Sequence, residues 1–241
     1  MVTVKYHVLP FLYRQTVWFS SAKPGILNCF NTYYKHCQYK KDVFGYKRRP
    51  FFTKLIDLSR EQSQILQGFD KNTIYEVKRA DKDGVQTCTE SKVEAFISFY
   101  NSFAQTKNLP LLTSRIKNYR SNLIITKAVY EGKDVVMHSY VLDEQLKRVR
   151  LVHSASVFRN EADASKRAVI GRANRFLHYQ DILYFKEKGY HFYDLGGYAY
   201  QTQNQELEHI NRFKDGFGGE LKEESEYMPF LMVLFLKFRI R

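Results

Sequence analysis

The segment 148-RVRLVHSASVFRNEADASKRAVIGRANRFLHYQDILYFKEKGYHFYDLGG-197 decides the fold class of this chain. Residues 148–158 alternate between apolar and polar side chains, which is the two-residue period of a strand. Residues 166–188 carry apolar side chains at helical spacing, and Gly189 ends that helix. Residues 191–195 are short and β-prone before Gly196-Gly197 breaks the strand. A strand, a long helix and a second strand in this order predict an α/β protein.

The neighbouring segments extend this pattern in both directions. Leu123–Tyr130 and Val135–Leu142 flank a Glu-Gly-Lys-Asp turn and predict an antiparallel hairpin beside residues 148–158. Upstream, Thr53–Leu58 and Val85–Cys88 read as strands, and two capping-box spacings, Ser59 with Gln62 and Ser91 with Glu94, predict two helix starts. Downstream we expect a short helix over Asn204–Lys214 and a terminal strand over Phe230–Phe238. On one side of the 148–158 strand the alternation places Val149, Leu151, His153, Ala155 and Val157.

Length and composition limit the class of protein. The chain has 241 residues, 44% of them hydrophobic and 26% charged, which excludes collagen-like and fully disordered chains. Its three cysteines are scattered and form no C-x-x-C pair, so neither a disulfide framework nor a structural zinc site is expected, and no metal is predicted. No apolar run is long enough to span a bilayer. We therefore expect a cytoplasmic protein.

Basic residues concentrate in the first fifty positions. Residues 1–50 hold nine Lys or Arg against the single acid Asp42, which is +8 of the formal +13. A basic, aromatic-rich segment can bind a phosphate backbone and stack bases. It can equally dock on an anionic membrane surface with Phe11, Trp18 and Phe19 at the interface. It can also be a solvated face of the fold. We expect residues 1–50 to be part of, or packed on, a domain of residues 51–241, with a boundary near Lys47–Pro50.

Several motifs resemble a GNAT-fold acyltransferase of the FemAB-like branch, which includes peptidoglycan-bridge and surface-polysaccharide N-acyltransferases. They are the TKLIDLS stretch from Thr53, KNTIYEVKRA from Lys71, RLVHSAS from Arg150, YDLGG from Tyr193 and INRFKDGFGG from Ile210. Together they cover about residues 51–230. The resemblance implies a single GNAT-like domain with a mixed, mostly antiparallel sheet and flanking helices, and acyl transfer to an amine.

The resemblance also implies a donor. Across the superfamily this is acyl-CoA or aminoacyl-tRNA, so no permanently bound cofactor is expected. In GNAT proteins a loop before the helix that follows the central strand holds the coenzyme A pyrophosphate on backbone N–H groups. The matching positions here are Arg167 and Gly171, with three intervening residues where the GNAT loop has two. FemAB-type domains share this departure.

Phe213-Lys214 matches the pair that lies at the reaction centre of the family. The resemblance therefore implies that Lys214 stabilises the oxyanion formed during acyl transfer, as a fixed ammonium does in a water-poor site. Its alternative role is that of a surface lysine placed favourably at the end of a helix. Asp194, at a strand end, either accepts the amine proton, orients substrate or caps a turn.

The remaining candidates concern substrate binding. His153 titrates in a useful range, although a strand histidine is more often structural. Tyr75 and Arg79 share one helical face and either bind an anionic sugar or phosphate or form a surface pair. Gly196, Gly197, Gly218 and Gly219 let backbone approach a ligand, or serve only in turns. Cys88 lacks a motif base and is a weak nucleophile candidate.

Two functional hypotheses follow. The first is an N-acyltransferase that moves an acyl or aminoacyl group from acyl-CoA or aminoacyl-tRNA to an amine of a cell-wall or surface-polysaccharide precursor. Its partners would be anionic donor and acceptor substrates, with tRNA and a peripheral membrane contact as further options. The alternative is a non-catalytic module with the same fold that binds nucleic acid or an anionic surface through residues 1–50.

Overall fold

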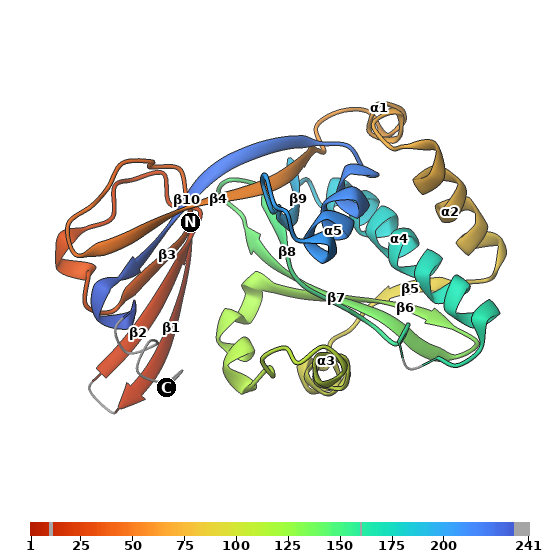
Figure 1. Ribbon diagram of the computed structural model, residues 1–241, viewed down its shortest axis with the longest axis horizontal. Coiled ribbons are helices and arrows are strands. Elements are labelled where there is room, and N and C mark those ends of the chain that lie inside the picture. Colours follow the sequence, from red (N-terminus) through yellow and green to blue (C-terminus); the bar gives the residue numbers. More distant parts are fainter. Residues whose placement is uncertain (10–11, 160, 234–241) are drawn as a thin grey trace.

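The structure of the protein is a computed structural model that describes residues 1–9, 12–159 and 161–233. Its ten strands form one sheet in the order β1-β2-β3-β10-β4-β9-β8-β7-β6-β5 (Figure 1). Among these residues only the β2–β3 and β8–β9 pairings are parallel. The strands are β1 (Val2–Leu9), β2 (Leu12–Trp18), β3 (Thr32–Cys37), β4 (Tyr46–Asp57), β5 (Gln86–Thr89), β6 (Leu123–Tyr130), β7 (Lys133–Asp143), β8 (Arg148–Ser156), β9 (Phe192–Gly197) and β10 (Glu220–Pro229). The predicted mixed, mostly antiparallel sheet is confirmed.

Helices flank the half of the sheet that contains β5 to β9. The α-helices are α1 (Gln62–Gln67), α2 (Lys71–Lys82), α3 (Val93–Thr106), α4 (Ala164–Glu187) and α5 (Gln205–Asp215), and two 3₁₀ segments are η1 (Ile26–Asn28) and η2 (Ser114–Asn122). Figure 1 shows α3 on one side of this half and α4, α2 and α5 on the other. Ala173 and Leu177 of α4 are fully buried in the core against β6 and β7. The predicted long helix and the central place of β8 are both confirmed.

Three strands within the first forty residues also belong to the sheet. β1 and β2 form a hairpin, and β3 pairs with β10. The sheet curls so that Val2, Val4 and Trp18 share a core cluster with Val141 of β7, and the side-chain amide of Asn118 in η2 donates to the carbonyl of Lys5 (3.0 Å). Trp18 and Phe19 are therefore buried, which corrects their expected place at a membrane interface. Phe11 lies outside the described residues.

A long antiparallel ladder joins two halves of the molecule. We call β5 to β9 with their helices the helical half, and β1 to β3 with the adjoining parts of β4 and β10 the strand half. β4 and β10 pair without a break from Tyr46 with Pro229 to Leu55 with Glu220. The predicted strand at Thr53–Leu58 is the second half of β4, and Lys47–Pro50, where the sequence predicts a boundary, lies inside the same strand. The two strands arch from the strand half to the helical half in Figure 1.

Both predicted capping boxes are wrong in detail. The first helix begins after Glu61, whose N–H donates to the Gln64 side chain, and Ser59 instead donates to Asp57. A second helix then begins after Asp70, which accepts from the N–H of Thr73 (2.6 Å). α3 follows Lys92 and has no side-chain cap. An acidic side chain bonds beside each predicted cap, since Asp57 accepts from the N–H and the hydroxyl of Ser59, and Glu90 accepts from the N–H of Lys92.

The expected terminal strand is also corrected. The last strand is β10, residues 230–233 are helical, and residues 234–238 of the predicted strand lie outside the described residues. β10 carries Glu224, Ser225 and Glu226 in buried positions. An apolar-run criterion overlooks such a strand, since basic groups on its neighbours compensate its buried charges.

Candidate functional site

The two parallel strands β8 and β9 separate in the middle of the sheet. They pair at only three positions, which end at Arg150 opposite Asp194. Beyond this point β8 continues beside β7 to Ser156, whereas β9 continues beside β4 to Gly197. We call the place where they part the wedge. Because ligands of α/β sheets bind outside the carboxyl ends of parallel strands where connections diverge, the wedge is the first candidate for a site.

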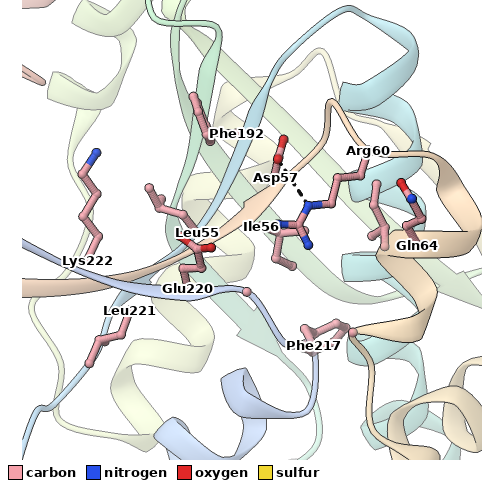
Figure 2. A pocket seen from close by; sticks show the side chains of 13 residues that line it. Leu55, Ile56, Asp57, Arg60, Gln64, Phe192, Phe217, Glu220, Leu221 and Lys222 are labelled. Atoms are coloured by element: carbon pink, nitrogen blue, oxygen red, sulfur yellow. Dashed lines mark hydrogen bonds and ion pairs between the residues drawn. The ribbon is translucent and has the colours of Figure 1, made fainter.

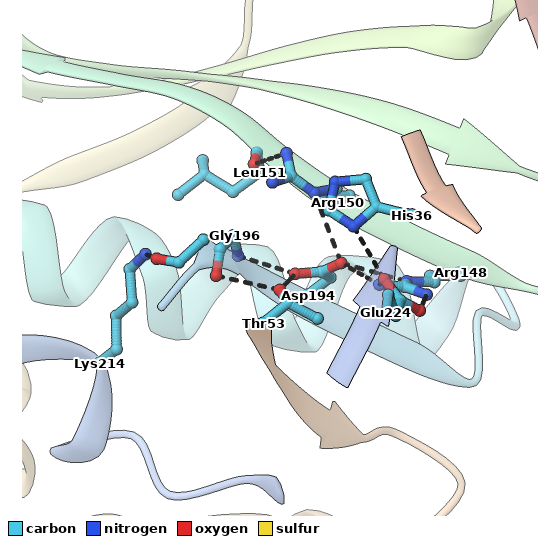
Figure 3. A network of polar contacts seen from close by, with 10 residues as sticks. His36, Thr53, Arg148, Arg150, Leu151, Asp194, Gly196, Lys214 and Glu224 are labelled. Atoms are coloured by element: carbon cyan, nitrogen blue, oxygen red, sulfur yellow. Dashed lines mark hydrogen bonds and ion pairs between the residues drawn. The ribbon is translucent and has the colours of Figure 1, made fainter. Parts of the chain in front are cut away.

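Two cationic side chains meet at the wedge around Gly196. A Cβ on Gly196 would lie 3.9 Å from Lys214 Nζ, 4.0 Å from Arg150 Nη2 and only 3.1 Å from the carbonyl oxygen of Leu151. Gly196 also has a φ of +82°, so both its backbone conformation and its surroundings require glycine. Figure 3 shows Lys214 reaching from α5 toward the Gly196–Gly197 backbone, where its ammonium donates to the carbonyl of Gly197.

Lys214 is held in an environment that opposes its charge. Burial, followed by the nearby Arg150 guanidinium, lowers the pKa of Lys214 to about 8, and the Asp194 carboxylate only partly offsets this. Near neutral pH the ammonium is still mostly protonated, yet it can lose its proton within the physiological range. A cation of this kind is suited to stabilise the negative charge that develops in a transition state.

Arg150 is a buried arginine whose hydrogen bonds are incomplete. It is 8% exposed, its Nη1 donates to the carbonyl of Leu151 (3.1 Å), and its Nε has no hydrogen-bond partner among the described residues. Its nearest carboxylate oxygen, on Asp194, is 3.6 Å from Nε. Burial lowers the pKa of Arg150 as well, although a guanidinium stays charged. An unsatisfied buried cation is where an anionic ligand would gain most.

Aromatic side chains from the strand half line the approach to Arg150. Its guanidinium carbon lies 5.5 Å from the ring centres of both Trp18 and Phe51. The Lys35 ammonium lies over the ring of the same Trp18, 4.9 Å from its centre, and burial lowers the pKa of Lys35 too. The basic and aromatic residues of the N-terminal segment thus contribute directly to the site.

Asp194 connects β9 to the neighbouring strands at the wedge through its hydrogen bonds. One of its oxygens accepts from the Thr53 hydroxyl and from the N–H of Gly196 (2.8 Å), and the other accepts from Arg148. Burial disfavours its charge, but Arg148 and then Arg150 lower its pKa below the usual range. Since the carboxylate is fully buried and its oxygens are engaged, the geometry favours a positioning role over proton acceptance from an amine.

Arg148 completes a network that sequence reasoning did not find. It pairs with Asp194 and also donates two hydrogen bonds to Glu224 of β10 (2.6 and 3.0 Å). His36 of β3 lies 2.8 Å from Glu224, and burial keeps the pKa of His36 well below its usual value (Figure 3). A neutral His36 therefore donates its Nδ1–H to the carboxylate. The only sequence signal is the Arg148-x-Arg150 spacing, which places two guanidinium groups on one face of a strand.

Phe213 packs beneath Lys214 rather than toward the wedge. Its ring centre is 5.5 Å from His178 of α4 and 5.4 Å from Phe217, and the Arg175 guanidinium lies over it at 4.9 Å. His178 belongs to a buried polar cluster in which its ring and Tyr140 both bond to the hydroxyl of Tyr193. The resemblance places Phe213 at the reaction centre. In this structure its ring packs on the core and supports α5.

A β-bulge changes the expected alternation of β8. The register between β7 and β8 shifts between Ser139 and Tyr140, so Leu151 packs on the α4 side while His153 contacts Tyr100 of α3 (ring centres 5.0 Å apart). His153 bonds to the Ser139 hydroxyl, and burial lowers its pKa to about 4. It is neutral at physiological pH and lies on the face that carries Arg150, not with Leu151 as the alternation predicts.

Four of the predicted substrate-binding residues lie elsewhere. A Cβ on Gly218 would be 2.4 Å from the carbonyl of Gly68, and one on Gly219 would be 2.5 Å from that of Leu55, so protein backbone fills the space expected for a ligand. Tyr75 is exposed on α2, at the outer edge of the helical half in Figure 1. Arg79 pairs with Asp83 four residues later (3.0 Å).

The start of α4 does not form the phosphate cradle expected at Arg167 and Gly171. The Asp163 carboxylate accepts from the N–H groups of Ser165 and Lys166. Arg167 donates to the carbonyl of Glu161 (3.3 Å), and Gly171 faces the Phe158 ring. A carboxylate thus occupies the position where a pyrophosphate would need free donors.

Two hollows lie near the opposite ends of β9. One, of about 420 Å³, lies between the ends of β4 and β10 and α1, and is lined by Asp57, Arg60, Phe192 and Phe217 among others (Figure 2). It sits at the amino end of β9, on the wrong side of the parallel pair for a typical ligand site. The other, of about 440 Å³, is lined by Tyr198–Thr202 and by Asn211, Arg212 and Asp215 of α5. It adjoins the carboxyl end of β9 and therefore offers room for a reactant beside the wedge.

The described ranges contain neither a metal-binding cluster nor a membrane-spanning helix. No group of three His, Cys, Asp or Glu side chains there is arranged to hold a metal ion. In the same residues no helix combines the length and apolar character needed to span a bilayer.

Comparisons with known proteins give the fold. No protein-family model matches the sequence, and no curated protein matches it. Among solved structures, FemX aligns with a TM-score of 0.59 at 11% identity, over 77% of this chain and 63% of FemX. The C-terminal domain of a putative lysylphosphatidylglycerol synthetase from Agrobacterium fabrum gives 0.54 at 15% identity, over 81% of this chain and 67% of that one. L-PGS from Bacillus licheniformis gives 0.54 at 12% identity, over 86% and 73%.

The predicted FemAB-like fold is confirmed. The chain shares the overall fold of these proteins, while it spans less than two thirds of FemX. At such low identities the likeness concerns the fold, so the chemistry has to be argued from the wedge itself.

Proposed function

We propose that this protein is an N-acyltransferase of the cytoplasm that uses the wedge as its active site. It would transfer an aminoacyl or acyl group to an amine of a cell-wall or surface-polysaccharide precursor. The observation that carries the proposal is the meeting of Arg150 and Lys214 around Gly196 where the parallel strands part. The name of the putative lysylphosphatidylglycerol synthetase agrees with transfer of an amino acid to a component of the cell envelope.

The reaction needs little covalent help from the protein. The neutral acceptor amine attacks the carbonyl carbon of the donor, a C–N bond forms, and the carbonyl oxygen becomes an oxyanion. Collapse breaks the C–O bond of an aminoacyl ester or the C–S bond of a thioester, and the amine proton passes to the leaving oxygen or sulfur. Lys214 would stabilise the oxyanion, and Arg150 would hold an anionic group of a reactant.

The region around α4 favours one donor over the other. Asp163 already caps the helix start where acyl-CoA would place its pyrophosphate, and like charges repel there. An aminoacyl-tRNA needs no such cradle, because its phosphates can be bound by the basic residues of the strand half, such as Lys35. We therefore favour aminoacyl-tRNA as the donor.

Ligand-dependent thermal stability tests the proposal. The purified protein is heated with panels of aminoacyl-tRNA, acyl-CoA and nucleotide-sugar acceptors, since a ligand that binds the folded state raises the midpoint of unfolding. We expect an upward shift with aminoacyl-tRNA that is lost in Arg150→Met and retained in Arg115→Met, which changes an exposed arginine of η2 that lines neither hollow. Transfer of a labelled amino acid to an amine acceptor then confirms turnover. No shift with any donor, or an equal shift in Arg150→Met, would contradict a wedge active site.

A further inference from the structure

The free end of the strand half exposes large apolar side chains. Leu27 of η1 is 90% exposed, Phe44 is 83% exposed and Phe30 is 68% exposed. Ile26 and Phe230 are also exposed. We call these five residues the apolar tip. Single exposed apolar residues are ordinary, but a group on adjoining loops indicates an interaction surface.

Contacts between the loops show that the tip is one surface. The N–H of Phe230 donates to the carbonyl of Gly45 (3.1 Å), next to Phe44. Gly45 packs tightly against Cys29, and the Tyr46 hydroxyl donates to the carbonyl of Gly25 (3.2 Å), beside η1. The buried cluster of Cys29, Val43 and Tyr46 supports the loops from below. The loops that carry the tip lie at the left end of Figure 1, away from α1 to α5.

Positive charge surrounds the apolar tip. Lys23, Lys41 and Lys47 are exposed and form no ion pair within the part of the chain that the structure describes. Lys40 and Arg49 are exposed as well, though each contacts a glutamate of β10. The single nearby acid of these loops is Asp42. Aliphatic and aromatic side chains inside a basic rim match the two layers of an anionic lipid surface, namely its hydrocarbon and its phosphate groups.

We propose that the apolar tip docks on an anionic membrane, with Leu27, Phe30 and Phe44 inserted among the lipids and the rim lysines at the headgroups. The charge of the rim disfavours a second copy of the chain, since two basic rims would face each other. RNA fits less well, because bases could stack on the phenylalanine rings of the tip but would leave Ile26 and Leu27, the most exposed side chain of the tip, without a matching partner. The inference is independent of the transferase proposal.

Vesicle flotation with the full-length protein tests this directly. Phosphatidylcholine vesicles are compared with vesicles that contain about one third phosphatidylglycerol, at about 0.15 M salt. We expect the protein to float with the anionic vesicles and not with the neutral ones. Leu27→Glu/Phe44→Glu should weaken partitioning by about ten-fold or more, because binding scales with the inserted apolar area. The matched control is Leu109→Glu/Leu111→Glu, which changes two exposed leucines of the loop after α3.

Charge variants test the rim separately. Each lysine near an anionic surface strengthens partitioning about five-fold, so Lys23→Gln/Lys41→Gln/Lys47→Gln should weaken it by about 100-fold. Lys92→Gln/Lys107→Gln/Lys133→Gln removes the same charge from the helical half and should leave partitioning within about two-fold of wild type. Equal losses in the two triple variants would mean that net charge, not the tip, drives binding, and would overturn the proposal.

A fluorescent side chain reports insertion. Trp18 is the only tryptophan and is buried, so Phe44→Trp adds an exposed one. On anionic vesicles we expect its emission to shift to shorter wavelength and to be quenched by brominated acyl chains. Emission unchanged by vesicles, or binding to single-stranded RNA that is lost in Leu27→Glu/Phe44→Glu while vesicle binding persists, would contradict membrane docking.

Discussion

Arg148 and Arg150 lie two residues apart on β8, both buried and both near Asp194, yet their surroundings differ. Arg148 makes close hydrogen bonds to two carboxylates, from Asp194 and Glu224. Arg150 has one backbone acceptor, an unpartnered Nε and a carboxylate no nearer than 3.6 Å. The first arginine is satisfied by the protein and holds three strands together. The second is satisfied only in part, which leaves bonding capacity for a ligand.

The largest effect should follow the loss of the satisfied arginine. Arg148→Met leaves Asp194 and Glu224 buried without their shared partner, and breaking a buried ion pair in this way costs about 3–5 kcal/mol. Urea denaturation should show this loss in the free energy of unfolding. Arg212→Met, which removes only an exposed pair with Glu208, should cost about 0.5 kcal/mol or less. Near-wild-type stability of Arg148→Met would contradict the view that Arg148, unlike Arg150, is needed to hold the strands together.

Loss of the lysine beside the wedge should affect the rate instead. Lys214→Met should lower turnover by about 10²–10³ while stability and donor binding stay nearly intact, because the missing donor acts mainly in the transition state. Lys214→Arg should restore only part of the rate, since a planar guanidinium places its charge differently. Lys188→Met, at the exposed end of α4, serves as the control. Turnover close to wild type in Lys214→Met would remove this residue from the mechanism.

The unsatisfied arginine should matter for ligands more than for folding. Arg150→Met should lower kcat/KM by about 10–100-fold, which corresponds to the loss of one charge-assisted hydrogen bond. Its free energy of unfolding should change by about 1 kcal/mol or less, because an incompletely bonded buried charge contributes little to stability. A loss of stability as large as that of Arg148→Met would show that the two arginines do the same work.

The smallest effect is a pH dependence. With a pKa of about 8, Lys214 loses its proton as pH rises, so kcat/KM should fall above about pH 8 and this decline should be absent from the residual activity of Lys214→Met. Stability has the opposite sign. Between about pH 8 and 10.5 the unfolded state binds more protons at this lysine than the folded state, so its contribution to stability rises with pH. A pH profile identical in wild type and Lys214→Met would contradict the assignment.

Local sequence patterns were enough to predict most of the strands and helices of the helical half. The hairpin of β6 and β7, the central β8 and the long α4 all follow from apolar periodicity, and the YDLGG and INRFKDGFGG motifs mark the wedge and Lys214. The start of α2 at Asp70 and the β8 bulge escape this reasoning, because a capping side chain and the cross-strand register decide them.

The rest of the site depends on contacts between distant parts of the chain. His36 and Glu224 are 188 residues apart in the sequence, and no periodicity relates them. In the sequence, Trp18 and Lys35 are noticeable only as part of a basic and aromatic composition. Their place near Arg150 depends on the curl of the sheet. Glycines make a similar point, since Gly196 opens on the wedge while Gly218 and Gly219 face neighbouring backbone.

The unbroken ladder of β4 and β10 also fixes the distance between the apolar tip and the wedge. A strand rises about 3.3 Å per residue, so Tyr46, beside the apolar tip, and Thr53, which bonds to Asp194, are at most about 23 Å apart. If the tip rests on a bilayer, the wedge is held at a limited height above the lipid headgroups. An acceptor anchored in the same membrane would then need a spacer of matching reach, and lengthening or shortening that spacer should change the rate without any change in the enzyme.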